Sequence, residues 1–115
     1  MIDTKLDYAY LTTKGRVTNK ARRIEIWFGA KRRDSRTLYM IAAGGEESHW
    51  VQNALANPEV KIRIGKEALR ALARRASRPE QKPARQLMCV KYGESEYFDE
   101  DWARKGLLMA FDLLR

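Results

Sequence analysis

The sequence predicts a mainly β domain of the α+β class, in which five or six short strands close into a small barrel and helices interrupt them. Two observations support this prediction. Apolar and polar residues alternate in short segments such as 24–28 and 60–64, a pattern typical of strands buried on one face. Glycines at 44–45 and 65 end such segments. Because each strand needs partners, a small β-barrel is the natural way to bury them.

The first part of the chain is expected to form three strands. Residues 7–13 (DYAYLTT) favour a strand through their tyrosines and threonines. Residues 23–30 (RIEIWFGA) alternate, which places Trp27 on the face opposite the isoleucines. After a charged loop, residues 37–43 (TLYMIAA) supply a third strand. The strand, loop, strand spacing of the last two segments predicts an antiparallel meander.

Two helices and two further strands are expected in the remainder. Ser48 is a candidate N-cap for a helix over 48–57 (SHWVQNALAN), which an asparagine-proline pair ends. Residues 60–64 (VKIRI) alternate as a strand does. Residues 79–92 (PEQKPARQLMCVKY) have helical spacing and stop at a glycine. The apolar segment 106–114 (GLLMAFDLL) predicts a closing strand.

Residues 67–76 (EALRALARRA) allow two interpretations. As a helix they place Leu69, Leu72 and Ala73 on one stripe, and alanine, leucine and arginine are good helix formers. As a strand they place Leu69, Ala71 and Ala73 on one face. Local propensity favours the helix, and the strand stays open.

Length and composition predict one globular domain over residues 1–115. Hydrophobic residues make up 44% and charged residues 33% of the chain. The single cysteine, Cys89, cannot pair within the chain, and its apolar neighbours predict a buried thiol. This fits a reducing compartment, so we expect a cytoplasmic protein. No segment approaches the roughly twenty apolar residues of a membrane span, and no membrane anchor is expected.

Positive charge is concentrated in two separate segments. The net charge is +8, and residues 1–40 and 61–91 each hold ten of the lysines and arginines. If folding brings both segments to one surface, that surface will attract phosphates, nucleic acid, anionic lipid or a polyanionic coenzyme. Charge alone does not choose among these partners.

The basic turn GRVTNKAR (15–22) is more specific than a run of charges. Gly15 and Asn19 tolerate positive φ, so the turn can point backbone N–H groups inward, and Thr18 and the cations add further donors. Such a turn is suited to holding phosphate, although a solvated loop is the alternative. The pair Gly44-Gly45 before a helix likewise permits close approach of a ligand, or is simply a tight turn.

Metal and hydrolase sites are not expected. His49 and Cys89 are the single residues of their types and lie far apart in sequence, so the clustered ligands that zinc requires are missing. No Ser/His/Asp or Cys/His arrangement is indicated. Paired acids occur at 46–47 and within 94–101, and the second group is expected on a polar loop at the solvated surface.

Taken together, GRVTNKAR, a strand, a loop, an apolar strand, GG, HWVQNALANPEV and IRIG resemble the deazaflavin-dependent nitroreductase family of flavin and deazaflavin oxidoreductases. The similarity is strongest over roughly residues 10–66. It implies a six-stranded antiparallel split β-barrel of the FMN-binding, pyridoxamine phosphate oxidase-like type, with two or three short helices. Related chains run a strand where residues 67–76 lie, so the resemblance favours the strand there.

The resemblance also implies a function. The expected protein is an F(420)H2-dependent reductase that transfers a hydride from the reduced deazaflavin, coenzyme F(420), to a quinone, a nitro compound or an activated double bond. Alternatives are an FMN-binding split-barrel oxidoreductase and a non-catalytic flavin- or deazaflavin-binding protein. A basic nucleic-acid-binding barrel is a further alternative, although no nucleic acid is expected as a partner. The expected partners are a small-molecule electron acceptor and, as in many split barrels, a second copy in a homodimer.

Site residues follow from the same resemblance. Trp27 matches an aromatic position near the substrate in some members, and His49 is a candidate proton donor. Two departures from the family pattern are Val17, where lysine is common, and Asn19, where glycine is usual. The implied cofactor-binding residues are Arg16, Thr18, Asn19, Lys20, Arg22, Ala42, Ala43, Gly44, Gly45, Trp50 and Asn53.

Overall fold

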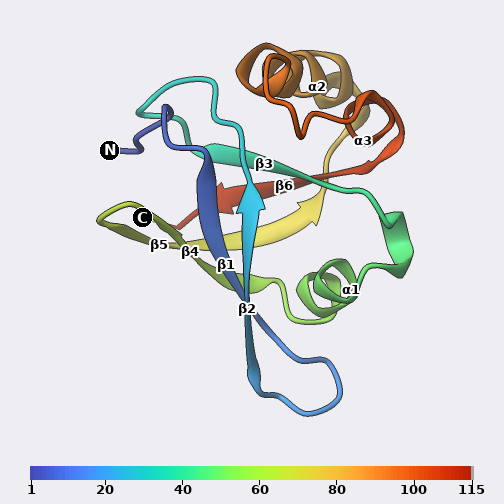
Figure 1. Ribbon diagram of the computed structural model, residues 1–115. Helices are drawn as coiled ribbons and strands as arrows, with labels where there is room; N and C mark the ends of the chain where they lie inside the picture. Colours follow the sequence, from blue (N-terminus) through green and yellow to red (C-terminus); the bar gives the residue numbers. More distant parts are fainter. Residues whose placement is uncertain (115) are drawn as a thin grey trace.

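The computed structural model describes residues 1–114, in which six antiparallel strands curl into a half-barrel (Figure 1). The expected mainly β fold is confirmed. The strands are β1 (Tyr8–Lys14), β2 (Ala21–Trp27), β3 (Thr37–Ala42), β4 (Glu59–Ile64), β5 (Glu67–Arg75) and β6 (Leu107–Leu113). The helical elements are η1 (Gly45–Glu47), α1 (His49–Ala56), α2 (Arg78–Tyr92) and α3 (Glu100–Lys105).

The strand order is β2-β1-β4-β5-β6-β3, so the second and third strands lie at opposite edges of the sheet. The predicted meander is therefore wrong for this pair. In the part of the chain that the structure describes, the backbone pairing between the two edges is an isolated bridge, in which Gly29 and Tyr39 exchange hydrogen bonds of 2.9 Å. The twist of the sheet brings its edges together, and the connection after β2 crosses from one to the other. The alternation of apolar and polar residues within a strand does not indicate which strands lie at the edges of the sheet or which edges meet.

Residues 67–75 form β5, so the helix that propensity favours is wrong and the strand is confirmed. Its register places Leu69 opposite Ile62 of β4, and Ala73 opposite Phe111 of β6. Strands β4 and β6 would each have an unpaired edge if no strand lay between them. Pairing on two sides outweighs the small intrinsic helix preference of alanine, leucine and arginine.

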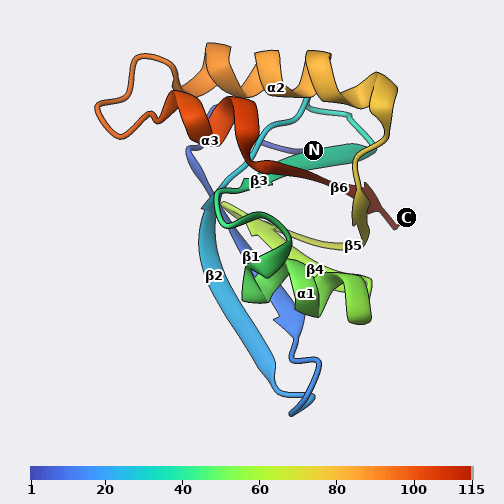
Figure 2. The same cartoon turned by 90° about the vertical axis from the view of Figure 1, so that its right-hand side faces the viewer.

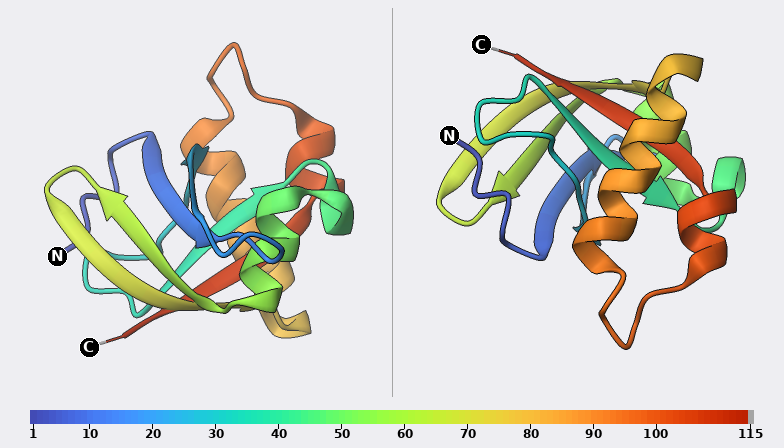
Figure 3. Two further views of the ribbon diagram at one scale, coloured as in Figure 1. Left: turned by 90° about the horizontal axis from the view of Figure 1, so that it is seen from below. Right: turned by 90° about the horizontal axis from the view of Figure 1, so that it is seen from above.

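The helices cover the two ends of the half-barrel. Figure 2 shows α2 and α3 above β3 and β6, with α1 at the opposite end near β1 and β4. Viewed from above in Figure 3, α2 lies across β3 and β6. Beneath it a second apolar cluster includes Met88 and Tyr92 of α2, Ile41 of β3 and Leu108 of β6. No helix in residues 1–114 is long and apolar enough to cross a bilayer.

One local prediction in the second half is confirmed in its main part, and another is wrong. The acidic stretch 94–101 was expected on a solvated polar loop; residues 94–99 form such a loop, and only the last two residues belong to α3. This helix begins at Glu100, and the Asp99 side chain caps it by accepting a 2.9 Å hydrogen bond from the backbone N–H of Asp101. Acids in its first turn and bases in its last favour so short a helix. Cys89, predicted to be a buried thiol, is partly exposed on α2.

Arg74 of β5 joins α2 to the sheet. Its Nη1 lies 2.6 Å from Oε1 of Glu80 in α2, and its Nε lies 2.7 Å from Oδ2 of Asp112 in β6. Tyr39 of β3 donates its hydroxyl hydrogen bond to the second oxygen of Glu80. Burial and this hydrogen bond raise the pKa of Tyr39 to about 12. One arginine thus connects β3, β5, β6 and the start of α2.

Lys91, near the end of α2, has a half-buried ammonium group. Its Nζ donates a 3.0 Å hydrogen bond to the carbonyl oxygen of Phe28 and lies 3.7 Å from the centroid of that ring. Burial lowers the pKa of Lys91 to about 8, while the charges of Asp7 and Asp3 act in the opposite direction. The folded protein therefore releases this proton at a lower pH than the unfolded chain does.

This difference predicts a pH dependence of stability. Between about pH 8 and 10 the unfolded chain binds more protons at Lys91, so its contribution to the free energy of unfolding rises with pH. Lys91→Met should remove that rise, which we expect to be about 1 kcal/mol after discounting for partial exposure. Urea unfolding at several pH values measures the difference between the two proteins. Lys82→Met, at an exposed position of the same helix, is the control and should keep the rise. If the free energy of unfolding of Lys91→Met rises with pH as much as that of the unaltered protein, Lys91 is not the group responsible.

Candidate functional site

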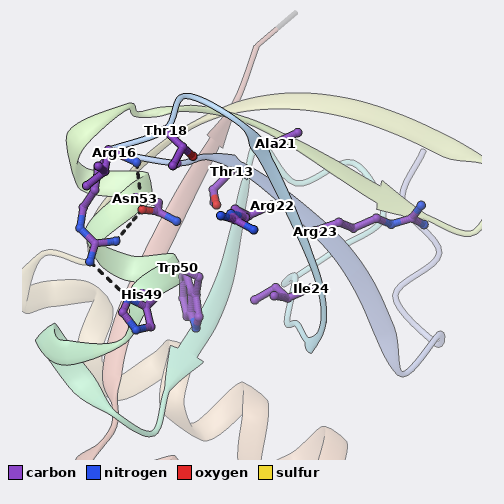
Figure 4. A pocket seen from close by; sticks show the side chains of 12 residues that line it. Thr13, Arg16, Thr18, Ala21, Arg22, Arg23, Ile24, His49, Trp50 and Asn53 are labelled. Carbon is purple, nitrogen blue, oxygen red and sulfur yellow. Dashed lines mark hydrogen bonds between the residues drawn. The ribbon is translucent and has the colours of Figure 1, made fainter.

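The main pocket lies between the β1–β2 hairpin and α1 and has a volume of about 640 Å³ (Figure 4). Residues from both elements line it. Those predicted from the sequence are Arg16, Thr18, Arg22, His49, Trp50 and Asn53. Gly15, Val17 and Ala21 also line it; they belong to the predicted turn but were not among the implied cofactor-binding residues. Thr13, Arg23 and Ile24 were missed by sequence reasoning. The basic turn and the helix after the glycine pair, far apart in sequence, thus form opposite walls of one cavity.

The hairpin turn is closed by its own backbone. The N–H of Gly15 donates to the carbonyl of Lys20 (2.8 Å), and the N–H of Asn19 donates to the carbonyl of Gly15 (2.9 Å). Asn19 has φ 59°, as its residue type allowed. Gly15 does not use positive φ; a Cβ there would lie 2.9 Å from Oγ1 of Thr18, so this glycine is needed for close packing. The turn is therefore a fixed wall of the pocket.

Asn53 attaches the turn to α1. This residue is 5% exposed, and its Oδ1 accepts hydrogen bonds from the backbone N–H (3.2 Å) and from Nη1 (2.7 Å) of Arg16. Nη2 of Arg16 lies 3.2 Å from Nδ1 of His49. Since a guanidinium can only donate, Nδ1 accepts and the ring proton of His49 is on Nε2. The arginine is thereby held in one orientation, as the dashed lines in Figure 4 show.

Thr13, near the end of β1, has a buried hydroxyl that faces the pocket. It is 2% exposed, and within residues 1–114 its Oγ1 is the one buried side-chain polar atom without a hydrogen-bond partner. The sequence carried a partial signal, because Ala9, Leu11 and Thr13 share the inward face of the strand. Unpaired buried hydroxyls are uncommon and need an explanation.

The charge and shape of the pocket favour an anionic ligand with a planar part. Among the described residues that line it, Arg16, Arg22 and Arg23 are the charged ones, and no carboxylate is present. Trp50 packs against Phe111 of the core with ring centroids 6.3 Å apart, so its indole forms a supported wall. An aromatic wall beside fixed cations suits a ring system that carries a phosphate.

The other predicted site residues lie outside the pocket lining. Lys20 belongs to the turn, and Asn19 borders an adjacent cavity of about 280 Å³ beside Thr12 and Lys61. Residues 42–45 span the end of β3 and the start of η1, where Gly45 has φ 63°. Their contact with a cofactor stays a prediction.

Trp27 lies in the second apolar cluster. Its ring stacks on Tyr92 of α2 with centroids 4.1 Å apart and an interplanar angle of 2°. Trp102 of α3 packs edge-on against it, with centroids 5.3 Å apart. Trp27 therefore helps to dock α2 and α3, and a contact with substrate stays a prediction.

A half-barrel of six antiparallel strands with a cationic, aromatic-walled pocket beside its hairpin defines a cofactor-binding split barrel. Residues 3–103 match the model of the F420H(2)-dependent quinone reductase family, so the chain belongs to this family. Coenzyme F(420) is accordingly its cofactor, and the chain is a deazaflavin-dependent oxidoreductase.

Solved structures share the fold at low sequence identity. One titled F420-H2 Dependent Reductase (FDR-A) is 23% identical, with 94% of each chain covered and a TM-score of 0.67. An F420 reductase is 14% identical, with 99% of this chain and 94% of the other covered and a TM-score of 0.68. A proposed 5-nitroimidazole antibiotic resistance protein from Bacteroides thetaiotaomicron is 13% identical, with 99% and 76% covered and a TM-score of 0.72.

The residues of the pocket fit the coenzyme. Its phosphate requires donors and positive charge, which the arginine side chains and the Thr18 hydroxyl supply without a competing carboxylate. The expectation that the turn points its backbone N–H groups at a phosphate holds less well, because those of Gly15, Arg16, Asn19 and Lys20 already donate within the protein. Its planar ring requires a flat apolar surface, which Trp50 supplies. Its hydrogen-bonding atoms require polar partners, and the unpaired hydroxyl of Thr13 is one.

Proposed function

We propose that the protein transfers a hydride from reduced F(420) to a small electron-poor acceptor. A quinone is the preferred candidate for this acceptor, followed by nitro compounds and activated double bonds. The observation that carries the proposal is the pocket between the hairpin and α1, in which all charged lining residues are cations and one wall is aromatic. The family description supports the quinone as acceptor class. No side-chain nucleophile is required for such a transfer.

Each pocket residue has a proposed task. When bound, the reduced deazaflavin supplies the hydride. Arg16, Arg22 and the turn with Thr18 would bind the phosphate, and Asn53 keeps Arg16 in place for it. Trp50 would support the ring. Asn19, Lys20 and residues 42–45 would complete the binding surface from the turn and the end of β3.

The acceptor has two proposed contacts. His49 would donate a hydrogen bond from Nε2–H to the oxygen of the reduced product, because its Nδ1 accepts from Arg16, and the proton that completes the reduction would pass to that oxygen from solvent. Trp27 lies outside the pocket lining, three residues beyond Ile24 on β2, and is the proposed aromatic contact for an acceptor that extends from the pocket along this strand. The positions of both reactants, rather than a strong acid or base, would then account for most of the rate.

A binding titration tests the cofactor directly. We expect the fluorescence of F(420) to change on addition of protein, with a Kd that increases with salt because arginines bind the phosphate. FMN, added in a parallel titration, should bind more weakly. If F(420) gives no change at saturating protein, the proposed function fails; tighter binding of FMN would instead favour the FMN-dependent oxidoreductase.

Turnover separates an enzyme from a carrier. With reduced F(420), we expect loss of the reduced coenzyme to depend on both protein and menadione, and to a lesser extent on a nitroaromatic compound. Tight F(420) binding without turnover of any acceptor would favour a non-catalytic deazaflavin-binding protein.

We also propose that the protein works in the cytoplasm as a homodimer. A structure titled as a domain-swapped dimer, 22% identical with 92% of this chain covered and a TM-score of 0.70, supports testing the dimer. The single cysteine, which lies partly exposed, is compatible with a reducing compartment.

A further inference from the structure

The unpaired hydroxyl of Thr13 lies beside a second unused donor. Oδ1 of Asn53 accepts both hydrogen bonds from Arg16, which fixes the orientation of the amide and turns Nδ2 away from the arginine. Nδ2 makes no hydrogen bond within residues 1–114. Both residues line the same pocket, and in Figure 4 the hydroxyl oxygen of Thr13 and the amide nitrogen of Asn53 are turned toward the same space.

Packing alone does not explain a threonine here. The inward positions of β1 before it are alanine and leucine, both fully buried, and valine would fill the same volume as threonine without a polar atom. A buried hydroxyl without a partner destabilises the free protein. The hydroxyl is therefore better explained by a partner that arrives with the ligand.

The environment indicates what that partner is. Thr13 and Asn53 are 2% and 5% exposed and uncharged, whereas Arg16 and Arg22, which would neutralise a phosphate, are exposed. Moving a charged group to the buried, neutral side of the pocket is costly, but a hydroxyl or carbonyl oxygen can be placed there if it is hydrogen-bonded.

We infer that Thr13 and Asn53 form a subsite for an uncharged oxygen of the bound coenzyme, a hydroxyl of its polyol chain or a carbonyl of its ring, while the exposed arginines take the phosphate. This inference rests on the proposed function, since it concerns the same pocket. Thr13 binds through its hydroxyl, and Asn53 through the amide N–H groups that Arg16 leaves free. The subsite selects ligands that present an acceptor at this depth.

Thr13→Val tests the subsite because it should weaken binding of the coenzyme while it stabilises the ligand-free protein. Binding of F(420), followed by ligand fluorescence, should weaken about 5- to 10-fold, the loss typical of one neutral hydrogen bond. The midpoint of thermal unfolding without ligand should rise by about 2–5 °C, because an unpaired hydroxyl has been removed. Thr13→Ser, which keeps the hydroxyl, should retain binding. Thr13→Ala removes the hydroxyl as well and serves if valine does not fit.

Thr12→Val is the matched control. Thr12 is the neighbouring residue on the same strand and faces the opposite side of the sheet. Its variant should therefore neither weaken F(420) binding nor raise the unfolding midpoint of the ligand-free protein. If Thr13→Val raises the unfolding midpoint but leaves the Kd of F(420) within twofold of the unaltered protein, the subsite is excluded while the proposed function stands.

The phosphate-free riboflavin-like fragment of F(420) distinguishes the source of the oxygen. An equal loss of affinity for F(420) and for this fragment in Thr13→Val supports an uncharged oxygen. A loss for F(420) alone would mean that the phosphate contacts Thr13 and would overturn the assignment. If the unaltered protein binds neither molecule, the proposed function itself is wrong.

Discussion

Replacing Arg74 with methionine is expected to lower the free energy of unfolding at neutral pH by about 2 kcal/mol and the unfolding midpoint by about 5–10 °C. The variant leaves the carboxylates of Glu80 and Asp112 without the cation that separates them. A fully buried pair broken in this way typically costs about 3–5 kcal/mol. The value expected here is smaller because Arg74 is 39% exposed and water screens the pair.

The same variant should flatten the acid dependence of stability. The hydrogen bonds from Arg74 lower the pKa of Glu80 and that of Asp112. Carboxylates with a depressed pKa in the folded state stabilise it above their unfolded pKa values of about 4, and this stabilisation is lost as the pH falls further. The difference in unfolding free energy between the two proteins should therefore shrink from pH 7 to pH 3, as measured by denaturant titration.

Arg75→Met is the matched control for Arg74. Arg75 is the next residue, and it pairs with Glu46 at 2.6 Å with both side chains more than half exposed. Exposed pairs contribute about 0–1 kcal/mol. Similar small losses for both variants would show that the link between α2 and the sheet does not depend on Arg74.

Replacing Asn53 with leucine is expected to weaken F(420) binding by about 30-fold or more, close to 2 kcal/mol, because the variant removes two hydrogen bonds that orient Arg16. The amide donors that face the pocket are removed as well. The unfolding midpoint should fall by about 5 °C, since the partly buried N–H of Arg16 is left unpaired. Ligand fluorescence gives the Kd, and calorimetry gives the midpoint.

Gln52→Leu controls for the same exchange of amide for leucine one position earlier on α1. Gln52 donates a 3.1 Å hydrogen bond to the carbonyl of Glu46 and does not line the pocket. Its variant should bind F(420) as the unaltered protein does. Binding by Asn53→Leu within threefold of the unaltered protein would exclude Asn53 as the support of the site.

The fold class was predictable because it depends on local periodicity, and the failures occur where distant pairing decides. Residues 67–75 have helical propensity, yet strands on both sides require a partner there. The separation of β2 from β3 follows from how the sheet closes, about which the loop between them carries no information. Helix α3 was missed because six residues give no periodicity, although Asp99 and the charges at each end were readable signals.

The site was predictable in part for a similar reason. The turn and the helix have recognisable residue types, and Arg16, Arg22, Trp50 and Asn53 do line one pocket. Thr13 was not predicted because its importance lies in having no partner, a property of the surroundings and not of the residue type. Gly15 was predicted for the wrong reason, since the packing of Thr18 and not the sign of φ requires it.

The three tryptophans lie in two separate parts of the molecule, so their fluorescence reports on two different events. Trp50 lies in the pocket wall, whereas Trp27 and Trp102 lie together beneath α2 at the other end of the half-barrel. Quenching of Trp50 emission therefore reports occupancy of the pocket, and a spectral shift of the other two reports detachment of α2. In a Trp50→Phe background the second signal can be followed alone, so ligand binding and local unfolding can be measured separately in the same chain without any added label.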